Sequence, residues 1–194
     1  MSAPRETVLL HACCAVCAGY PLAKLLTDYV PVVYFCNPNI YPAEEYERRR
    51  DECRRHALAS GCAFVEDGPD ADAWEQAVRG LEAEPEGGRR CAACFRHRLA
   101  RTAAFAREKG IGLFTTTLTV SPHKNSALIL AVGAELAAEK PGLVFLPENF
   151  KKRDGFKQTM AIAKEQGFYR QNFCGCRFRA APDGRRGETQ APNI

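Results

Sequence analysis

Three cysteines lie within five residues, directly after a short apolar run. The run is Val8–Leu10, and the stretch that follows is His11-Ala-Cys-Cys-Ala-Val-Cys17. One free cysteine packs well as a small apolar side chain, so packing does not explain three together. Adjacent cysteines are also poorly placed to bridge each other, because disulfide geometry is specific. A metal is the simplest reason to gather thiolates this densely, and the chain must fold around that loop.

The compartment decides how the ten cysteines are interpreted. No apolar run approaches the roughly 18 residues of a membrane span, and the polar stretch Met1–Thr7 lacks a secretory pattern. We therefore expect a cytoplasmic protein without membrane association. In a reducing compartment, clustered thiols indicate metal binding or redox chemistry rather than a disulfide framework.

Short apolar segments alternate with longer polar ones along the chain. Strands are expected over residues 8–12, 30–36, 63–66, 113–119 and 143–146. Helices are expected over residues 18–27, 43–60 and 71–79, from the turn at 121–125 to about 139, and over 154–166. A further helix, which Cys91 opens or precedes, is expected to run through Arg98 to Lys109. This alternation predicts an α/β fold with a mainly parallel sheet, in one domain over residues 1–180 with a disordered tail at 181–194. Ligands of such sheets bind beyond the carboxyl ends of the strands, where the first cysteine loop lies.

Two further cysteine clusters lie far along the chain, Cys91-Ala-Ala-Cys94 and Cys174-Gly-Cys176. A C-x-x-C pair turns two sulfurs toward one point, and with two thiolates of the first cluster it makes four ligands. That number suits zinc and an iron–sulfur cluster equally well. The adjacent pair leans slightly toward iron–sulfur, because zinc ribbons usually use two C-x-x-C knuckles. The isolated cysteines are expected to be buried or incidental, namely Cys36, Cys53 and Cys62.

The Cys174-Gly-Cys176 pair suggests a different chemistry. A disulfide across one intervening residue closes a small, strained ring that is readily reduced. Gly175 relieves the backbone constraint. The pair therefore suits electron relay or thiol chemistry, with a further metal knuckle as the alternative.

Charge is concentrated near the C-terminus. Residues 151–179 carry eight Lys or Arg and two Asp or Glu, an excess of +6, so the rest of the chain sums to −2 of the net +4. Such a segment suits a phosphate-contacting surface, and a solvated charged face is the alternative. The chain has no G-x-x-x-x-G-K-[ST] loop and no G-x-G-x-x-G after the first strand, which disfavours nucleotide hydrolysis.

Several ordered blocks resemble one known family, the QueH-type epoxyqueuosine reductases, from the first strand to Phe178. The blocks are His11-Ala-Cys-Cys-Ala-Val-Cys17, Asn37-Pro-Asn-Ile-Tyr-Pro42 with Glu45-Tyr46 and Arg49, Gly80-Leu-Glu with Glu84-Pro-Glu86, Arg90-Cys-Ala-Ala-Cys94 with Arg98-Leu99 and Thr102-Ala103, Thr115-Thr-Thr-Leu118 with Ser121-Pro122 and Asn125, and Tyr169-Arg-Gln-Asn-Phe-Cys-Gly-Cys176. Val16 stands where the family usually has Pro, and Phe173 where Tyr is usual. Neither departure removes a polar group that we would assign to chemistry.

The resemblance implies reduction of epoxyqueuosine to queuosine on the tRNA wobble base, without cobalamin and with an external electron donor. It implies a 4Fe-4S cluster held by Cys13, Cys14, Cys91 and Cys94. It also implies a redox-active disulfide between Cys174 and Cys176. An additional iron beside the cluster is implied as well, with Cys17 and Asp70 as its candidate ligands. The implied fold is Rossmann-like and similar to the adenine-nucleotide α-hydrolase (HUP) type.

The remaining assignments follow from residue type. Candidates for tRNA phosphate contacts are Lys151, Lys152, Arg153, Arg170 and Arg177. Tyr41 or Phe173 could stack on an extruded base, whereas Phe150 is expected in the core. Proton donors are sought among His11, Tyr169 and the thiols. Two other functions stay open: an iron–sulfur-dependent tRNA sulfur transferase, which would need ATP, and a colourless structural zinc protein that binds RNA.

Overall fold

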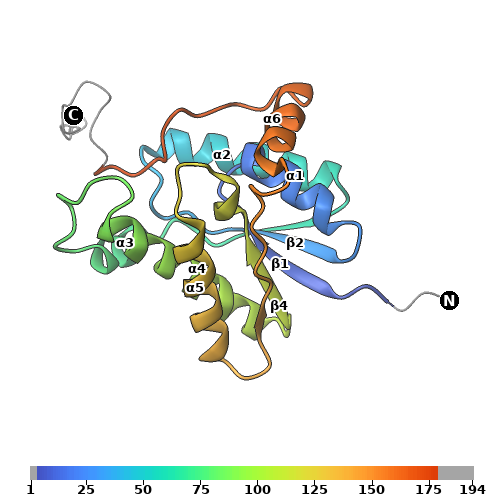
Figure 1. Ribbon diagram of the computed structural model, residues 1–194. Coiled ribbons are helices and arrows are strands. Elements are labelled where there is room, and N and C mark those ends of the chain that lie inside the picture. The colour runs from blue at the N-terminus through green and yellow to red at the C-terminus, as the bar shows by residue number, and fades with distance from the viewer. Residues whose placement is uncertain (1–3, 179–194) are drawn as a thin grey trace.

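The computed structural model describes residues 4–178, and within them a five-stranded parallel sheet carries helices on both faces (Figure 1). The strand order is β3-β2-β1-β4-β5, and each neighbouring pair is parallel. The strands are β1 (Thr7–His11), β2 (Val30–Phe35), β3 (Ala63–Glu66), β4 (Leu113–Thr116) and β5 (Val144–Phe145). The predicted α/β class with its parallel sheet is confirmed. The predicted tail at 181–194 lies outside the described residues, and the single domain over 1–180 stays a prediction.

The helices form two layers that enclose the sheet (Figure 1). On one side lie α1 (Ala15–Leu25), α2 (Ala43–Ala59) and α6 (Gly155–Glu165), and on the other lie α4 (Arg89–Glu108) and α5 (Ser126–Ala138). The short helix α3 (Ala71–Ala77) packs beside α4. Alternate residues of β1 supply the two cores, because successive strand side chains point to opposite faces. Val8 and Leu10 pack in one core with Leu22, and Leu9 packs in the other with Leu99.

Several element boundaries differ from the predicted ones, and three of these differences change the carboxyl edge of the sheet. Helix α1 begins at Ala15, directly within the cysteine loop, so that Pro21 lies inside the helix rather than in its first turn. Helix α4 begins at Arg89, which places its C-x-x-C pair on the first turns. The fourth strand ends at Thr116, whose hydroxyl accepts a hydrogen bond from the Leu118 amide, and residues Thr117–Val120 form the 3-10 turn η1. That side-chain bond offers the backbone an alternative to the strand ladder.

After α6 the chain runs back past α2 toward α3 (Figure 1). The Tyr169 amide donates to Glu52 of α2, and Phe178 stacks on Trp74 of α3 at 5.8 Å between ring centroids. Between these two anchors the segment meets the loop after β2, where Ile40 forms an antiparallel bridge with Cys176. This path carries the C-terminal cysteine pair to the carboxyl edge of the sheet. Phe150 is buried in the core, as predicted.

Among residues 4–178, no helix combines the length and the apolar character needed to cross a membrane.

Candidate metal centre and its cavity

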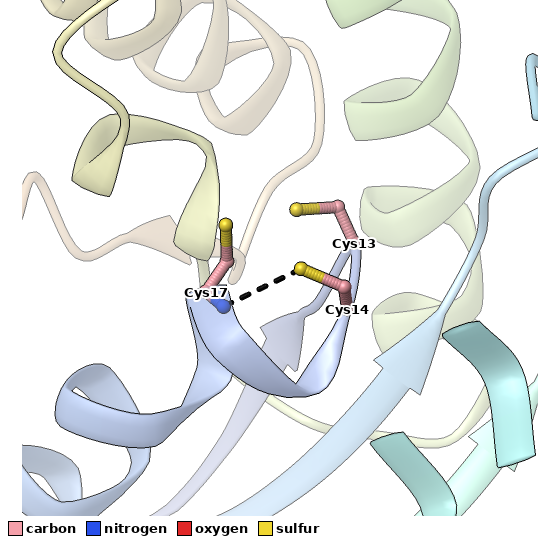
Figure 2. Close-up of side chains that lie close together, drawn as sticks. All are labelled: Cys13, Cys14 and Cys17. Atoms are coloured by element: carbon pink, nitrogen blue, oxygen red, sulfur yellow. Dashed lines mark hydrogen bonds between the residues drawn. The ribbon is translucent and has the colours of Figure 1, made fainter. Parts of the chain in front are cut away.

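The three thiols of the first loop converge at the start of α1 (Figure 2). The sulfur atoms of Cys13, Cys14 and Cys17 all lie within 4.8 Å of one another. Cys14 has an extended backbone and caps α1, because its sulfur accepts a hydrogen bond of 3.4 Å from the Cys17 amide. The sharp change from strand to helix thus turns the sulfurs of positions 14 and 17 toward the same space.

The electrostatics of this triad favour a cation. Hydrogen bonds from the Cys14 and Cys17 thiols hold the pKa of Cys13 well below its usual value. The same interaction with Cys13 raises the pKa of Cys14 to about 12 and lifts that of Cys17 well above its usual range. Three thiols packed this closely cannot all ionise side by side, since like charges oppose one another. A metal replaces their protons, so the donor set fits a thiolate-bound metal.

All three cysteine clusters meet at one cavity. Six cysteines line it, namely Cys13, Cys17, Cys91, Cys94, Cys174 and Cys176. Cys14 does not line the cavity, and its sulfur accepts a 3.0 Å hydrogen bond from the side-chain nitrogen Nε2 of Gln171, which does. Cys91 and Cys94 lie three apart on a helix, a spacing that places both side chains on one face. Sequence reasoning joined these clusters by motif, and the fold brings them to the same cavity.

The Cys174-Gly-Cys176 segment is fixed by a buried ion pair on α2. Nη2 of Arg49 lies 2.5 Å from Oε1 of Glu45. The Arg49 guanidinium also donates to the carbonyls of Phe173 and Cys174, at 3.2 Å each. The carbonyl of Gly175 accepts from the Tyr41 amide at 2.8 Å. Gly175 has a φ of +94°, a left-handed conformation that side chains disfavour. All ten cysteines lie within residues 4–178 and are free thiols there, without a disulfide bond. The Cys174–Cys176 disulfide therefore stays a prediction.

Cationic side chains surround the thiols. The cavity walls include Arg49, Arg90, Arg98 and Lys124. Burial alone would lower the pKa of Lys124, but the electrostatic interactions with Cys13 and Cys17 outweigh it and the pKa is raised. These charges suit a negatively charged group at the thiols. Sequence reasoning did not assign Lys124 or Gln171 to the site, although both fall in blocks at the carboxyl edge of the sheet.

Several predicted residues lie outside the cavity wall. Asp70 caps α3 through the Ala73 amide and pairs with Arg101 at 3.0 Å, so its role toward an additional iron stays a prediction. Tyr169 donates to Glu45 instead of lining the cavity. The three isolated cysteines are buried away from it, as expected: Cys36, Cys53 and Cys62.

The ring of His11 is buried, and both of its nitrogens form hydrogen bonds within the fold. One ring nitrogen, Nε2, lies 3.1 Å from the Cys36 carbonyl oxygen, and the other, Nδ1, lies 2.8 Å from the Thr116 hydroxyl. A carbonyl only accepts, so Nε2 carries the proton and Nδ1 accepts from the hydroxyl. Burial lowers the pKa of His11 to about 3. The neutral imidazole therefore has no proton directed at the cavity.

The sequence of this chain is similar to those of known proteins. The family model described as epoxyqueuosine reductase QueH matches residues 8–181. A protein of Streptococcus pyogenes serotype M1 is 38% identical over 187 residues, covering 93% of this chain and 72% of its own length. One of Thermotoga maritima is 37% identical over 179 residues, or 89% of each chain, and one of Acinetobacter baylyi is 36% identical over 172 residues, or 88% and 79%. All three carry the name epoxyqueuosine reductase QueH.

Proposed function

The chain belongs to the QueH family of epoxyqueuosine reductases, which makes it an oxidoreductase, and we propose that it reduces epoxyqueuosine to queuosine at the wobble position of tRNA. The observation that carries the chemical part of this proposal is the convergence of three separate cysteine clusters on one cavity. A structural zinc site needs four ligands and no spare thiols. This cavity holds more thiols than any such site requires, which favours redox chemistry.

We assign the ligands of a 4Fe-4S cluster to Cys13, Cys14, Cys91 and Cys94. The close contacts in the first cluster and the helical spacing of the second support this set. Cys17 is then the thiol left for an additional iron. When bound, the cluster supplies single electrons, and a neighbouring iron supplies Lewis acidity toward an epoxide oxygen.

The Cys174 and Cys176 dithiol matches the electron count of the reaction. Converting an epoxide to an alkene consumes two electrons and two protons and releases the oxygen as water. Closing a dithiol to a disulfide releases two electrons and two protons, so one pair balances one turnover. An external donor then reduces the disulfide again, which its strained ring favours. Arg49 holds the pair at the cavity through the carbonyls of Phe173 and Cys174.

Asn39 in the cavity wall offers an unpaired polar atom to the substrate. Asn39 is 5% exposed, and its side-chain oxygen has no hydrogen-bond partner among the described residues. A buried amide left unpaired is costly. A hydroxyl or N–H group of the modified nucleoside would satisfy it.

The direct test is conversion of the substrate by anaerobically prepared protein. The expected preparation is brown, contains iron and sulfide, and converts epoxyqueuosine to queuosine in tRNA once it is reduced. Visible spectroscopy, metal analysis and mass spectrometry of tRNA nucleosides measure these properties. An intact cluster and a competent reductant that leave the epoxide unchanged would refute the proposal. A colourless protein that contains zinc would do the same.

Gly175→Ala tests the conformation of the C-terminal pair. The residue has a φ of +94°, and an added Cβ would lie 3.2 Å from Cγ1 of Ile40. Left-handed strain of about 1–2 kcal/mol shifts a conformational equilibrium by a factor of about 5–30. We expect turnover to fall by roughly that factor while the visible spectrum is kept. The matched control is Gly110→Ala, which carries similar strain at a φ of +68° beyond the end of α4 and should keep full turnover.

A further inference from the structure

A second hollow opens beside the reaction cavity, between the start of α1, the 120–124 loop, α6 and the 170–174 segment. We call it the α6 groove. Its wall shares several residues with the cavity, among them Cys17, Lys124 and Cys174. A ligand that spans both would therefore place one part at the thiols and the next part in the α6 groove.

The floor of the α6 groove is apolar on one side. Phe156 is 39% exposed, although large aromatic side chains are usually buried, and Met160 and Val16 also line the groove. An exposed ring of this kind suits the face of a nucleobase, since stacking on aromatic side chains is how proteins hold unpaired bases.

The groove also contains a buried polar group with nothing to bind. Thr159 is 1% exposed, and its hydroxyl has no hydrogen-bond partner among residues 4–178. A helical threonine usually satisfies its hydroxyl on the carbonyl four residues earlier. The side-chain oxygen of Gln171 also has no hydrogen-bond partner among these residues, whereas the side-chain nitrogen donates to the Cys14 sulfur. A polar group of a bound ligand would satisfy each of these two atoms.

The charge around the groove is positive. Lys124 and Arg170 line it, and Glu86 is the one acidic residue in the described part of its wall. Exposed cations continue onto the start of α6 at Lys152, Arg153 and Lys157. Aromatic surface, polar groups and cations together match a nucleotide better than an apolar peptide, because a phosphate accompanies each base.

We infer that the α6 groove is a subsite for the nucleotide next to the modified one in the tRNA loop, with Phe156 stacking on its base and Arg170 contacting its phosphate. This inference rests on the proposed function, because it takes the modified nucleotide to lie at the thiols. An unpaired strand that enters the cavity carries its neighbour into the groove.

The test measures binding of a labelled RNA hairpin with the substrate anticodon stem and loop. Phe156→Ala is expected to weaken binding roughly 5- to 150-fold, the range for losing one stacked base, and Phe156→Trp should retain it. The control is Leu58→Ala, which removes another exposed apolar side chain, 59% exposed on α2, and should bind as the wild type does. Arg170→Ala should lower the salt dependence of binding by about one phosphate contact.

Abasic hairpins make the test specific. Removing the base on one side of the wobble position should weaken binding to the wild type but leave binding to Phe156→Ala unchanged, because the two losses share one contact. Equal losses in both proteins would overturn the inference, as would wild-type affinity of Phe156→Ala. Slower turnover of that variant with a donor protein alone, and not with a chemical reductant, would assign the groove to the donor and overturn the inference too.

Hairpin binding is measured without turnover. The proposed reaction and the proposed subsite can therefore be refuted independently of each other. A wild type that binds the hairpin through Phe156 but does not reduce the epoxide contradicts the function and leaves the subsite standing. A wild type that reduces the epoxide while Phe156→Ala binds normally contradicts the subsite alone.

Discussion

Cys91→Ala is expected to yield a protein that holds no stable cluster and has no measurable turnover. The Cys91 sulfur lies in the cavity wall on the first turn of α4, and the Gly87 amide donates to it at 3.2 Å. Losing a residue that merely orients a ligand costs about 10- to 100-fold in metal affinity or activity, so losing a ligand should cost at least as much. Iron and sulfide analysis after anaerobic reconstitution, with the visible spectrum, measures the loss.

The matched control is Cys62→Ala. Cys62 is buried and directly precedes β3, outside the cavity wall. It should keep the full iron content and spectrum, so that general sensitivity to losing a cysteine is separated from loss of a ligand. A Cys91→Ala protein with an unchanged iron content would show that Cys91 is not a ligand and that the proposed set is wrong.

Cys176→Ala is expected to keep the cluster and lose turnover. The residue lies beside Cys94 in a small apolar cluster with Trp74, so an alanine is tolerated there. Without its sulfur the pair cannot close a disulfide, and the two electrons and two protons of the reaction have no local source. Turnover should fall by roughly 10³-fold or more, as when a residue that makes or breaks bonds is removed.

A single-turnover experiment gives the sharpest measurement. Wild-type protein that has been reduced and freed of reductant should form product from its own dithiol, whereas Cys176→Ala should form none. Full product from the variant would contradict the redox role. Loss of colour in the variant would instead identify Cys176 as a metal ligand, the alternative that sequence alone leaves open.

The secondary structure and the class of site follow from local sequence. The third strand is predicted at residues 63–66 and found there, because a short apolar run between a glycine turn and a polar loop has few other solutions. The density of thiols in the first loop already excludes ordinary packing. The ends of helices are harder to predict from local sequence. Cys14 caps α1 with its sulfur, a contact that residue-type preferences for helix starts do not include.

The partners of the site come only from the fold. Gln171 reaches Cys14 across 157 residues, and Arg49 reaches the Cys174 carbonyl across 125. Along the sequence, Arg49 and Glu45 belong to a long polar helix, yet they form a buried pair that holds the C-terminal cysteines. Periodicity shows which residues share a face of one helix, but it carries no information on which distant segment packs there. Side-chain direction and burial are set by packing between elements. The sequence therefore determines the sheet and indicates that its cysteine clusters share a site, whereas the tertiary structure decides which distant side chains complete the cavity around them.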